Sequence, residues 1–209
     1  MIFHQLLERL EWMFTKKYIH RDIKPDNMMM GMGFESNIVH MIDFGLTHRY
    51  IDQKSGEHIP LTTNKNLIGT CRYVSLNSHR GVELSRRDDL ITLGYVMISL
   101  FKGSLPWQDI RADRPQERYL RVEKAKMACS NSELCEGCPR EFEIYLDYVM
   151  ALQFTEEPNF VIMKKLVVSA AVAAEVDIFD NIFDWSLLLS QPNSLVNPLA
   201  HQVSQSWWQ

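Results

Sequence analysis

The stretch His20-Arg21-Asp22-Ile23-Lys24-Pro25-Asp26-Asn27 places three different functional groups within eight residues. Asp22 supplies a carboxylate, Lys24 an ammonium group and Asn27 an amide. A second carboxylate follows in the tripeptide Asp43-Phe44-Gly45. Side chains of these types can orient a hydroxyl group, neutralise phosphate charge and ligate Mg²⁺. The rest of the chain is therefore interpreted around this stretch.

Together the two motifs match H-R-D-x-x-x-x-N followed by D-F-G, a combination typical of protein kinases. Four fixed positions match by chance in a chain of ordinary composition and this length only on the order of once in a thousand. The second motif makes a coincidence rarer still. The combination predicts phosphoryl-transfer chemistry.

Apolar periodicity predicts that most of the chain is helical. Residues 2–14 carry an amphipathic stripe at helical spacing, and residues 88–101 are apolar on every side after two acidic residues, which predicts a helix inside the protein. Further helices are expected within residues 107–127, 139–154 and 161–176.

Two short strands are expected beside the first motif, a buried one at 28–30 and a second at 38–42. Their pairing as a hairpin would bring Asn27 and Asp43 together, as two ligands of one metal site require. The expected fold class is mainly α: a protein-kinase-like C-terminal lobe, with a helical bundle around a buried helix and a short β-hairpin at the catalytic site.

Two other regions have little regular pattern. Residues 45–85 are polar and irregular, and a segment of this length is usually functional or disordered. Because it follows Asp43-Phe44-Gly45, we expect an activation and substrate-binding segment. Residues 190–209 are rich in Ser, Asn, Gln and Pro, and we expect a disordered tail.

The bulk composition excludes some partners. The chain of 209 residues is 46% hydrophobic and 23% charged, as in a globular protein with one substantial core. Its net charge of −4 gives no basic field for nucleic acid or an anionic membrane. Its most apolar run, 166–174, is far shorter than the roughly twenty residues of a transmembrane helix. We expect neither a nucleic-acid nor a membrane partner.

Cysteine usage predicts the compartment. Cys71, Cys129, Cys135 and Cys138 occur in a sequence without a signal-peptide pattern, which favours reduced thiols and an intracellular home. Cys135 and Cys138 have C-x-x-C spacing, but no second pair or histidine cluster accompanies them, so zinc binding or redox chemistry is the weaker interpretation. A cytoplasmic location is expected, with the nucleus as an additional one.

Beyond the two motifs, the chain resembles the casein kinase I family of serine/threonine protein kinases over residues 1 to about 189. The resemblance lies in several quoted stretches besides 20–27 and 43–46, and it identifies the chain as similar to the C-terminal lobe of that family. These stretches are His58-Ile59-Pro60, Asn64-Lys65-Asn66-Leu67-Ile68-Gly69-Thr70, Ser75-Leu76-Asn77, Ser85-Arg86-Arg87-Asp88-Asp89-Leu90, Gly103-Ser104-Leu105-Pro106-Trp107-Gln108 and Phe183-Asp184-Trp185.

The resemblance implies roles for five residues. Asp22 would be the catalytic base that orients the substrate hydroxyl, and Lys24 would neutralise the γ-phosphate of ATP as charge builds. Asn27 and Asp43 would hold Mg²⁺. Asp89 would support the backbone of the catalytic loop from the buried helix. The implied activity is ATP-dependent phosphorylation of proteins, with ATP and Mg²⁺ as cofactors.

The family prefers acidic or already phosphorylated protein substrates, and the resemblance implies two anion sites. Arg21 and Lys65 keep two basic positions of the first site, but the third position, usually Lys, is His48 here. Arg72 and Arg118 keep the basic pair of the second site. Asp109 replaces a family glycine beside that pair, and its charge should weaken phosphate binding. Solvated surface charges are the alternative interpretation of these residues.

The sequence departs from the family on the nucleotide side. It contains no glycine-rich loop over ATP, no strand Lys with its partner Glu, and no adenine-binding hinge, so we expect the nucleotide-clamping lobe to be missing and activity of this chain alone to be low. Residues 167–176 are also more apolar than the family pattern. Two further hypotheses stay open: a non-catalytic, pseudokinase-like interaction module, and a structural fragment. Oligomeric state and physiological substrate are not predicted.

Overall fold

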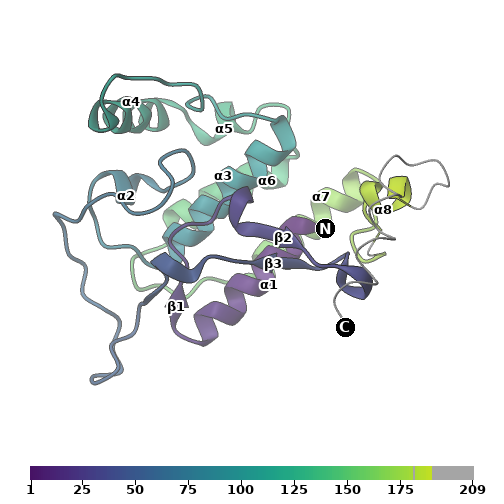
Figure 1. Cartoon of the computed structure of the whole chain (residues 1–209), viewed down its shortest axis with the longest axis horizontal. Coiled ribbons are helices and arrows are strands. Elements are labelled where there is room, and N and C mark those ends of the chain that lie inside the picture. The colour runs from purple at the N-terminus through teal and green to yellow at the C-terminus, as the bar shows by residue number, and fades with distance from the viewer. Residues whose placement is uncertain (181, 190–209) are drawn as a thin grey trace, which may run out of the picture.

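The computed structural model describes residues 1–180 and 182–189, and this part of the chain is mainly helical (Figure 1), which confirms the predicted mainly α class. The tail expected to be disordered, 190–209, lies outside the described residues. The α-helices are α1 (Ile2–Thr15), α2 (Leu76–His79), α3 (Arg86–Lys102), α4 (Pro115–Ala128), α5 (Asn131–Leu134), α6 (Arg140–Ala151), α7 (Phe160–Ala173) and α8 (Asp184–Leu189).

Four short strands form two separate antiparallel pairs. Strand β2 pairs with β3 in the register Met28↔Met41, and β1 pairs with β4 in the register Ile19↔His48. The strands are β1 (Tyr18–Ile19), β2 (Met28–Met30), β3 (Val39–Met41) and β4 (His48–Arg49), and three single-turn 3₁₀ helices are η1 (Pro25–Asn27), η2 (Gly33–Glu35) and η3 (Phe44–Leu46).

Helix α3 runs through the middle of the described structure (Figure 1) and packs against α1 and α6. At its start the Asp88 carboxylate accepts a hydrogen bond from Ser85 N at 2.8 Å, and Gly103 at φ 80° ends it in the left-handed conformation that favours glycine. The helix is buried along most of its length, as its all-round apolar sequence predicts. Its last turn lies at the surface, where Leu100 and Phe101 are exposed.

Helix α1 closes one side of the core. Its predicted stripe is buried, with Leu6, Leu7 and Leu10 at 1% exposure or less. Helix α1 packs against α7 and against strands β1 and β3, which lie just before the two motifs. The buried stripe therefore fixes α1 against the core shortly before the catalytic stretch begins at His20.

The β2–β3 hairpin was predicted, but its burial was not predicted correctly. Val39 in β3 is 1% exposed and faces α1, whereas Met29 in β2 is 55% exposed. The hairpin lies over α1 at the surface (Figure 1), so alternate side chains of β2 point to solvent. The expectation of a buried strand at 28–30 was wrong, because a run of methionines carries no alternation from which to predict its solvent face.

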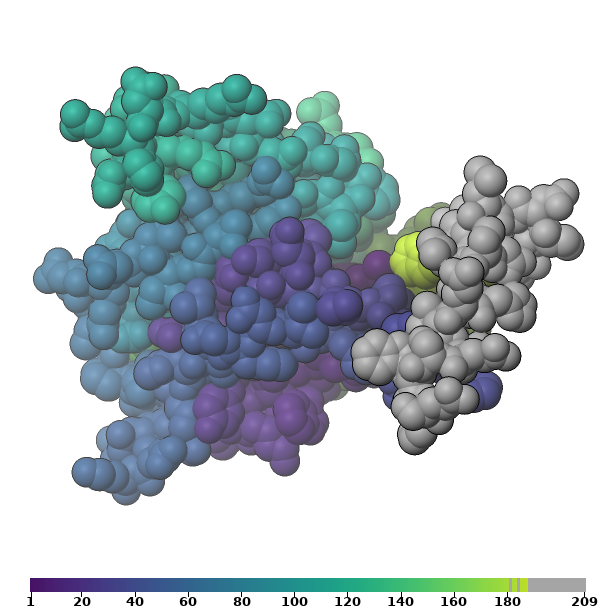
Figure 2. Space-filling model, in the orientation of Figure 1, coloured from purple at the N-terminus to yellow at the C-terminus, as the bar shows by residue number. Residues whose placement is uncertain are grey.

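The segment 45–85 crosses the surface between α1 and α4, as Figure 2 shows in blue. It is mostly irregular as predicted, and its short regular parts are the end of η3, β4, the single-turn helix α2 and an isolated bridge between Ile51 and His58. The β1–β4 pairing was not anticipated. It joins the start of this segment to Ile19, immediately before the catalytic stretch.

Among the described residues, no helix is long and apolar enough to cross a membrane. Helix α7, which contains the most apolar part of the sequence, has 14 residues. Lys164 and Lys165 lie within this helix and interrupt its apolar sequence. One face of α7 packs against α1 and α6 instead.

Candidate active site

The catalytic stretch is fixed to the core by a buried carboxylate on α3. Asp89 Oδ2 accepts a hydrogen bond from the backbone N–H of His20 at 2.6 Å, and Oδ1 accepts one from Arg21 at 2.9 Å. Asp89 is 2% exposed. Burial raises its pKa to about 7, although the two backbone donors favour the carboxylate. The predicted support of the loop by Asp89 has the geometry it requires.

This anchoring holds Arg21 in a left-handed conformation with φ 68°. Gly69 passes so close to it that an added Cβ would lie 2.4 Å from the Arg21 carbonyl oxygen, and Gly69 itself has φ 92°. Both reasons require glycine at this point. The close approach brings the next residue, Thr70, to the catalytic stretch.

Asp22 lies at the centre of a hydrogen-bond network. Lys24 Nζ is 2.8 Å from Oδ2, the Thr70 hydroxyl donates to Oδ1 at 2.7 Å, and Asn27 Nδ2 lies 3.2 Å from Oδ2. Asn27 also donates to the Asp22 backbone carbonyl at 2.9 Å. Three of these residues were predicted to act together, and the structure brings them together. Thr70 was missed because it lies 48 residues away in the sequence.

The network keeps Asp22 ionised. Burial raises the pKa of this carboxyl, but hydrogen bonds from Lys24, Thr70 and Asn27 and the Lys24 charge outweigh burial, so the pKa is lower than usual. The same contact raises the pKa of Lys24, chiefly through the hydrogen bond to Asp22. At neutral pH the site therefore holds a carboxylate that can accept a proton or a hydrogen bond, beside an ammonium group.

Asp43 reaches the same region through the hairpin. The backbone N–H of Ile42 donates to the Asn27 carbonyl at 3.0 Å. Because Asp43 is the residue after Ile42, this bond brings the backbones of the two predicted metal ligands together. Asp43 has φ 60°, is exposed, and accepts a hydrogen bond from Gly45 N at 3.2 Å. Its charge also acts on Lys24.

The donor set suits Mg²⁺, which prefers oxygen ligands. The Asn27 amide nitrogen is engaged by Asp22, which leaves its oxygen as an available ligand. Asp43 offers an accessible carboxylate. Asn27 and Asp43 are therefore the residues that would hold the ion, as the sequence predicts.

The first predicted anion site contains an acidic residue that sequence reasoning missed. Arg21, His48 and Lys65 all interact electrostatically with Glu83. Lys65 Nζ lies 3.0 Å from Glu83 Oε2, and Thr62 donates to the same oxygen at 3.1 Å. An incoming anion would therefore compete with Glu83 for Lys65.

The second predicted site is more open. Arg118 donates to the Ile110 carbonyl at 3.1 Å, and it lines a cavity of about 360 Å³ together with Asp109 and Arg111. The Arg72 guanidinium lies 5.7 Å from the ring centroid of Tyr73 instead. The structure therefore places Arg118 in one cavity with Asp109, and Arg72 is not among the residues that line this cavity.

A second carboxylate of α3 holds the substrate-side segment. Asp88 Oδ1 accepts from the Ser75 hydroxyl at 2.6 Å and from Asn77 at 2.8 Å, and Oδ2 accepts from Ser85 N at 2.8 Å. Burial raises the pKa of Asp88, opposed by these donors. The stretch Ser75-Leu76-Asn77 was used only as a family signature, and its bonding role was not predicted.

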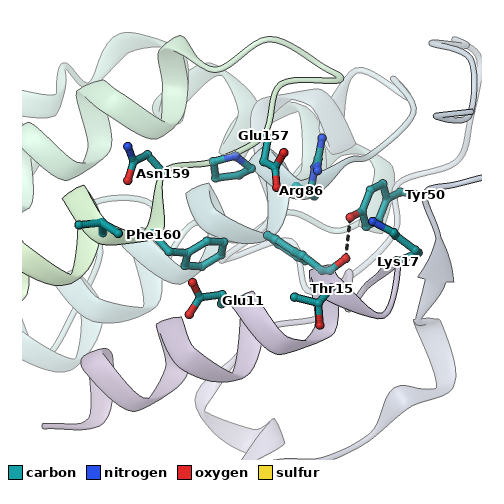
Figure 3. Close-up of a pocket in the computed structure, with 11 residues that line it drawn as sticks. Glu11, Thr15, Lys17, Tyr50, Arg86, Glu157, Asn159 and Phe160 are labelled. Atoms are coloured by element: carbon teal, nitrogen blue, oxygen red, sulfur yellow. Dashed lines mark hydrogen bonds between the residues drawn. The ribbon is translucent and has the colours of Figure 1, made fainter.

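A cavity of about 630 Å³ lies away from these residues, between the end of α1, Tyr50 and the start of α7 (Figure 3). Its wall carries Lys17 and Arg86 but also Glu11 and Glu157, so charges of both signs face it. It contains none of the predicted catalytic or metal-binding residues. The candidate active site is thus the network around Asp22, whose buried Asp22 and Asn27 lie beside the partly exposed Lys24, rather than this cavity.

The four cysteines are free thiols. Cys135 is buried, and burial raises its pKa to about 12, so its reactive thiolate is disfavoured. Cys138 follows it in a turn in which Cys138 N donates to the Cys135 carbonyl at 2.8 Å. No group of three or more metal-ligating side chains occurs in the part of the chain that the structure describes.

Comparison with known families agrees with this geometry. A family model described as the protein kinase domain matches residues 1–156. The match includes both motifs, the segment 45–85 and helix α3, which anchors the catalytic stretch. It covers most of the described fold. The extension of the domain to residue 189 stays a prediction. The chain belongs to the protein kinase domain family.

Proposed function

We propose that this protein is an ATP-dependent serine/threonine kinase of the casein kinase I type that phosphorylates acidic or already phosphorylated proteins. The observation that supports this most directly is the Asp22 carboxylate, held by Lys24, Thr70 and Asn27 on a loop that Asp89 fixes. Membership of the kinase family supports ATP as phosphate donor and proteins as acceptors. The casein kinase I type rests on the quoted sequence resemblance.

In this proposal Asp22 receives the hydroxyl group of the substrate. Its lowered pKa keeps it ionised as a hydrogen-bond acceptor, and the Thr70 and Asn27 contacts restrict its rotation. Lys24 is 22% exposed on its side chain, so its ammonium group can turn from Asp22 toward a phosphoryl oxygen. Mg²⁺, when bound, would supply positive charge to the phosphate groups. Positioning of this kind contributes most of the rate enhancement in phosphoryl transfer.

The proposal is tested by measuring binding of ATP·Mg²⁺ to the 209-residue chain and transfer of labelled phosphate to casein-like acidic substrates. Saturable binding with serine or threonine phosphorylation supports it. ATP binding with transfer to tyrosine alone would contradict the serine/threonine assignment. Absence of both binding and transfer would favour the interaction module.

We also propose a cytoplasmic location from the free thiols, with the nucleus as an additional one because the casein kinase I family, which the sequence resembles, works in both compartments. Protein substrates are the expected partners, and nucleic acid and membranes are not. Fluorescence microscopy of the tagged chain would test the location, and exclusive association with a secretory compartment would contradict it.

His48 should make the first anion site pH-dependent. Burial and then the charges of Arg21 and Lys65 lower the pKa of His48, so the ring is neutral at pH 7 and gains its proton as the pH falls below its ordinary value of 6.5. Protonation adds a positive charge, worth about 1 kcal/mol at a separation of about 4 Å in water. For doubly charged sulfate this energy doubles to about 2 kcal/mol, so sulfate affinity should rise by up to about 30-fold as the pH falls from 7.5 to 5 and the ring gains its proton.

The His48→Lys variant provides the matched test. Its charge persists across this pH range, so we expect tighter sulfate binding at pH 7.5 and a flat pH dependence, measured by calorimetric titration. Sulfate itself stays doubly charged over the range, unlike phosphate. A His48→Lys variant with wild-type affinity at pH 7.5 would show that His48 does not face the bound anion.

Asp109 should weaken the second anion site. It shares the cavity with Arg118 and Arg111, where its negative charge repels a phosphate group. Asp109→Gly should therefore raise the affinity for sulfate or a phosphopeptide by about fivefold, a change of roughly 1 kcal/mol. Equal affinities of the variant and the wild type, measured by titration at pH 7.5, would contradict the prediction.

A further inference from the structure

Lys126 is a buried ammonium group without a carboxylate partner. It lies on α4 with 4% exposure, and its Nζ donates to the carbonyl oxygens of Cys71 at 2.9 Å and Val74 at 2.6 Å. The ring centroids of Tyr95 and Trp107 lie 5.3 and 5.4 Å from the same nitrogen. No ion pair of Lys126 occurs within the residues the structure describes.

Such a site is costly, because a buried charge is compensated poorly by carbonyl groups and rings alone. Burial lowers the pKa of Lys126 to about 7, so burial disfavours its charged form. An apolar side chain of similar volume often stabilises a buried position better than a charged one. A lysine at this position is explained if its N–H donors fix the two backbone carbonyl groups, which an apolar side chain cannot do.

The two carbonyl groups belong to a tight turn. Within the turn, the N–H groups of Tyr73 and Val74 both donate to the Thr70 carbonyl, at 2.8 and 3.1 Å. The indole N–H of Trp107 donates to the Arg72 carbonyl at 2.7 Å. Three of the turn's outward carbonyl groups therefore accept hydrogen bonds from side chains of other elements, and Lys126 supplies two of these bonds.

The same turn begins with the residue that contacts the catalytic base. Thr70 donates its hydroxyl to Asp22 Oδ1 at 2.7 Å, and Cys71, whose carbonyl Lys126 holds, is the next residue. We propose that Lys126 is a positioning residue for Asp22, acting through the turn 70–74 that presents the Thr70 hydroxyl. The inference rests on the proposed role of Asp22, but its chain of contacts can be measured without phosphoryl transfer.

The test follows the carboxyl group of Asp22 by NMR titration in the full chain. Thr70→Val removes the hydroxyl directly and should raise the pKa of Asp22, because one of the groups that lower it is lost. Lys126→Met should raise the same pKa by at least half as much. It should also accelerate amide hydrogen exchange of residues 70–74 at least tenfold, with α1 and α6 unchanged.

The control is Lys102→Met, which removes another lysine-to-carbonyl hydrogen bond, from Lys102 Nζ to the Leu134 carbonyl at 3.1 Å. This bond lies outside the turn, so the pKa of Asp22 should stay at its wild-type value. If the pKa of Asp22 shifted as much in Lys102→Met as in Lys126→Met, the shift would reflect a general loosening of the fold. That result would overturn the inference.

If Lys126→Met does not fold, Lys126→Gln keeps an uncharged NH₂ donor group on a shorter side chain, and its Asp22 pKa should lie between those of the wild type and Thr70→Val. A wild-type pKa in the folded lysine variant, or in Thr70→Val, would overturn the inference. A chain that transfers no phosphate but shows these shifts would refute the proposed function while supporting the role of Lys126.

Discussion

Asp22→Asn should lower the rate of phosphoryl transfer by about 10²–10⁴-fold, the usual contribution of a positioned acid–base group. An amide cannot accept the proton of the substrate hydroxyl. It also replaces the charged acceptor of the Lys24 and Thr70 contacts. The KM for the protein substrate should change little, because the proposed anion sites would contact other parts of the substrate. Steady-state assays with an acidic peptide would measure kcat and KM separately.

The matched control is Asp147→Asn, a change of the same type on the exposed surface of α6, where Asp147 bonds only to Asn131 at 2.7 Å in the contacts described. Its kcat should equal that of the wild type. Activity that persists in Asp22→Asn at more than about a tenth of the wild-type rate would be inconsistent with the general-base contribution. Such a result would point to a contaminating kinase or to a different base.

Asp89→Ala should destabilise the fold by roughly 2–6 kcal/mol, because each buried donor left without a partner costs about 1–3 kcal/mol. The donors are the backbone N–H groups of His20 and Arg21, which both bond to the Asp89 carboxylate. Asn is a poor substitute, since its amide offers one acceptor and places a donor against the second N–H. Urea unfolding followed by circular dichroism would measure the change.

An exposed carboxylate with the same bonding provides the control for Asp89. Asp52 Oδ1 accepts hydrogen bonds from the backbone N–H groups of Lys54 and Ser55, at 2.9 and 2.8 Å, but it lies at the surface. Water can replace these bonds in Asp52→Ala, so its unfolding free energy should change much less. Equal losses in the two variants would show that burial does not determine the importance of Asp89.

The features that sequence alone predicted are those set by local pattern. The stripe of α1, the all-round apolar sequence of α3 and the hairpin between the motifs follow from the spacing of neighbouring residues. The motif likewise identified Asp22, Lys24 and Asn27, since a separation of five positions or fewer keeps them close in any compact loop.

The features that were missed depend on residues far apart in the chain. Thr70 reaches Asp22 across 48 positions, and Asn77 reaches Asp88 across 11 positions, which include the turn between α2 and α3. Glu83 pairs with Lys65 inside a cluster that sequence reasoning treated as purely basic. No periodicity records such contacts, because they arise only when the segment folds back over the helices.

Asp88 and Asp89 occupy adjacent positions in the first turn of α3, yet one holds the segment around Ser75 and the other holds the catalytic stretch at His20. The two segments are thus both hydrogen-bonded to the first turn of α3. When thermal motion displaces that turn, both segments should move in phase, so the distance between them fluctuates less than the position of either one. Paired relaxation measurements on the two segments should show correlated amplitudes.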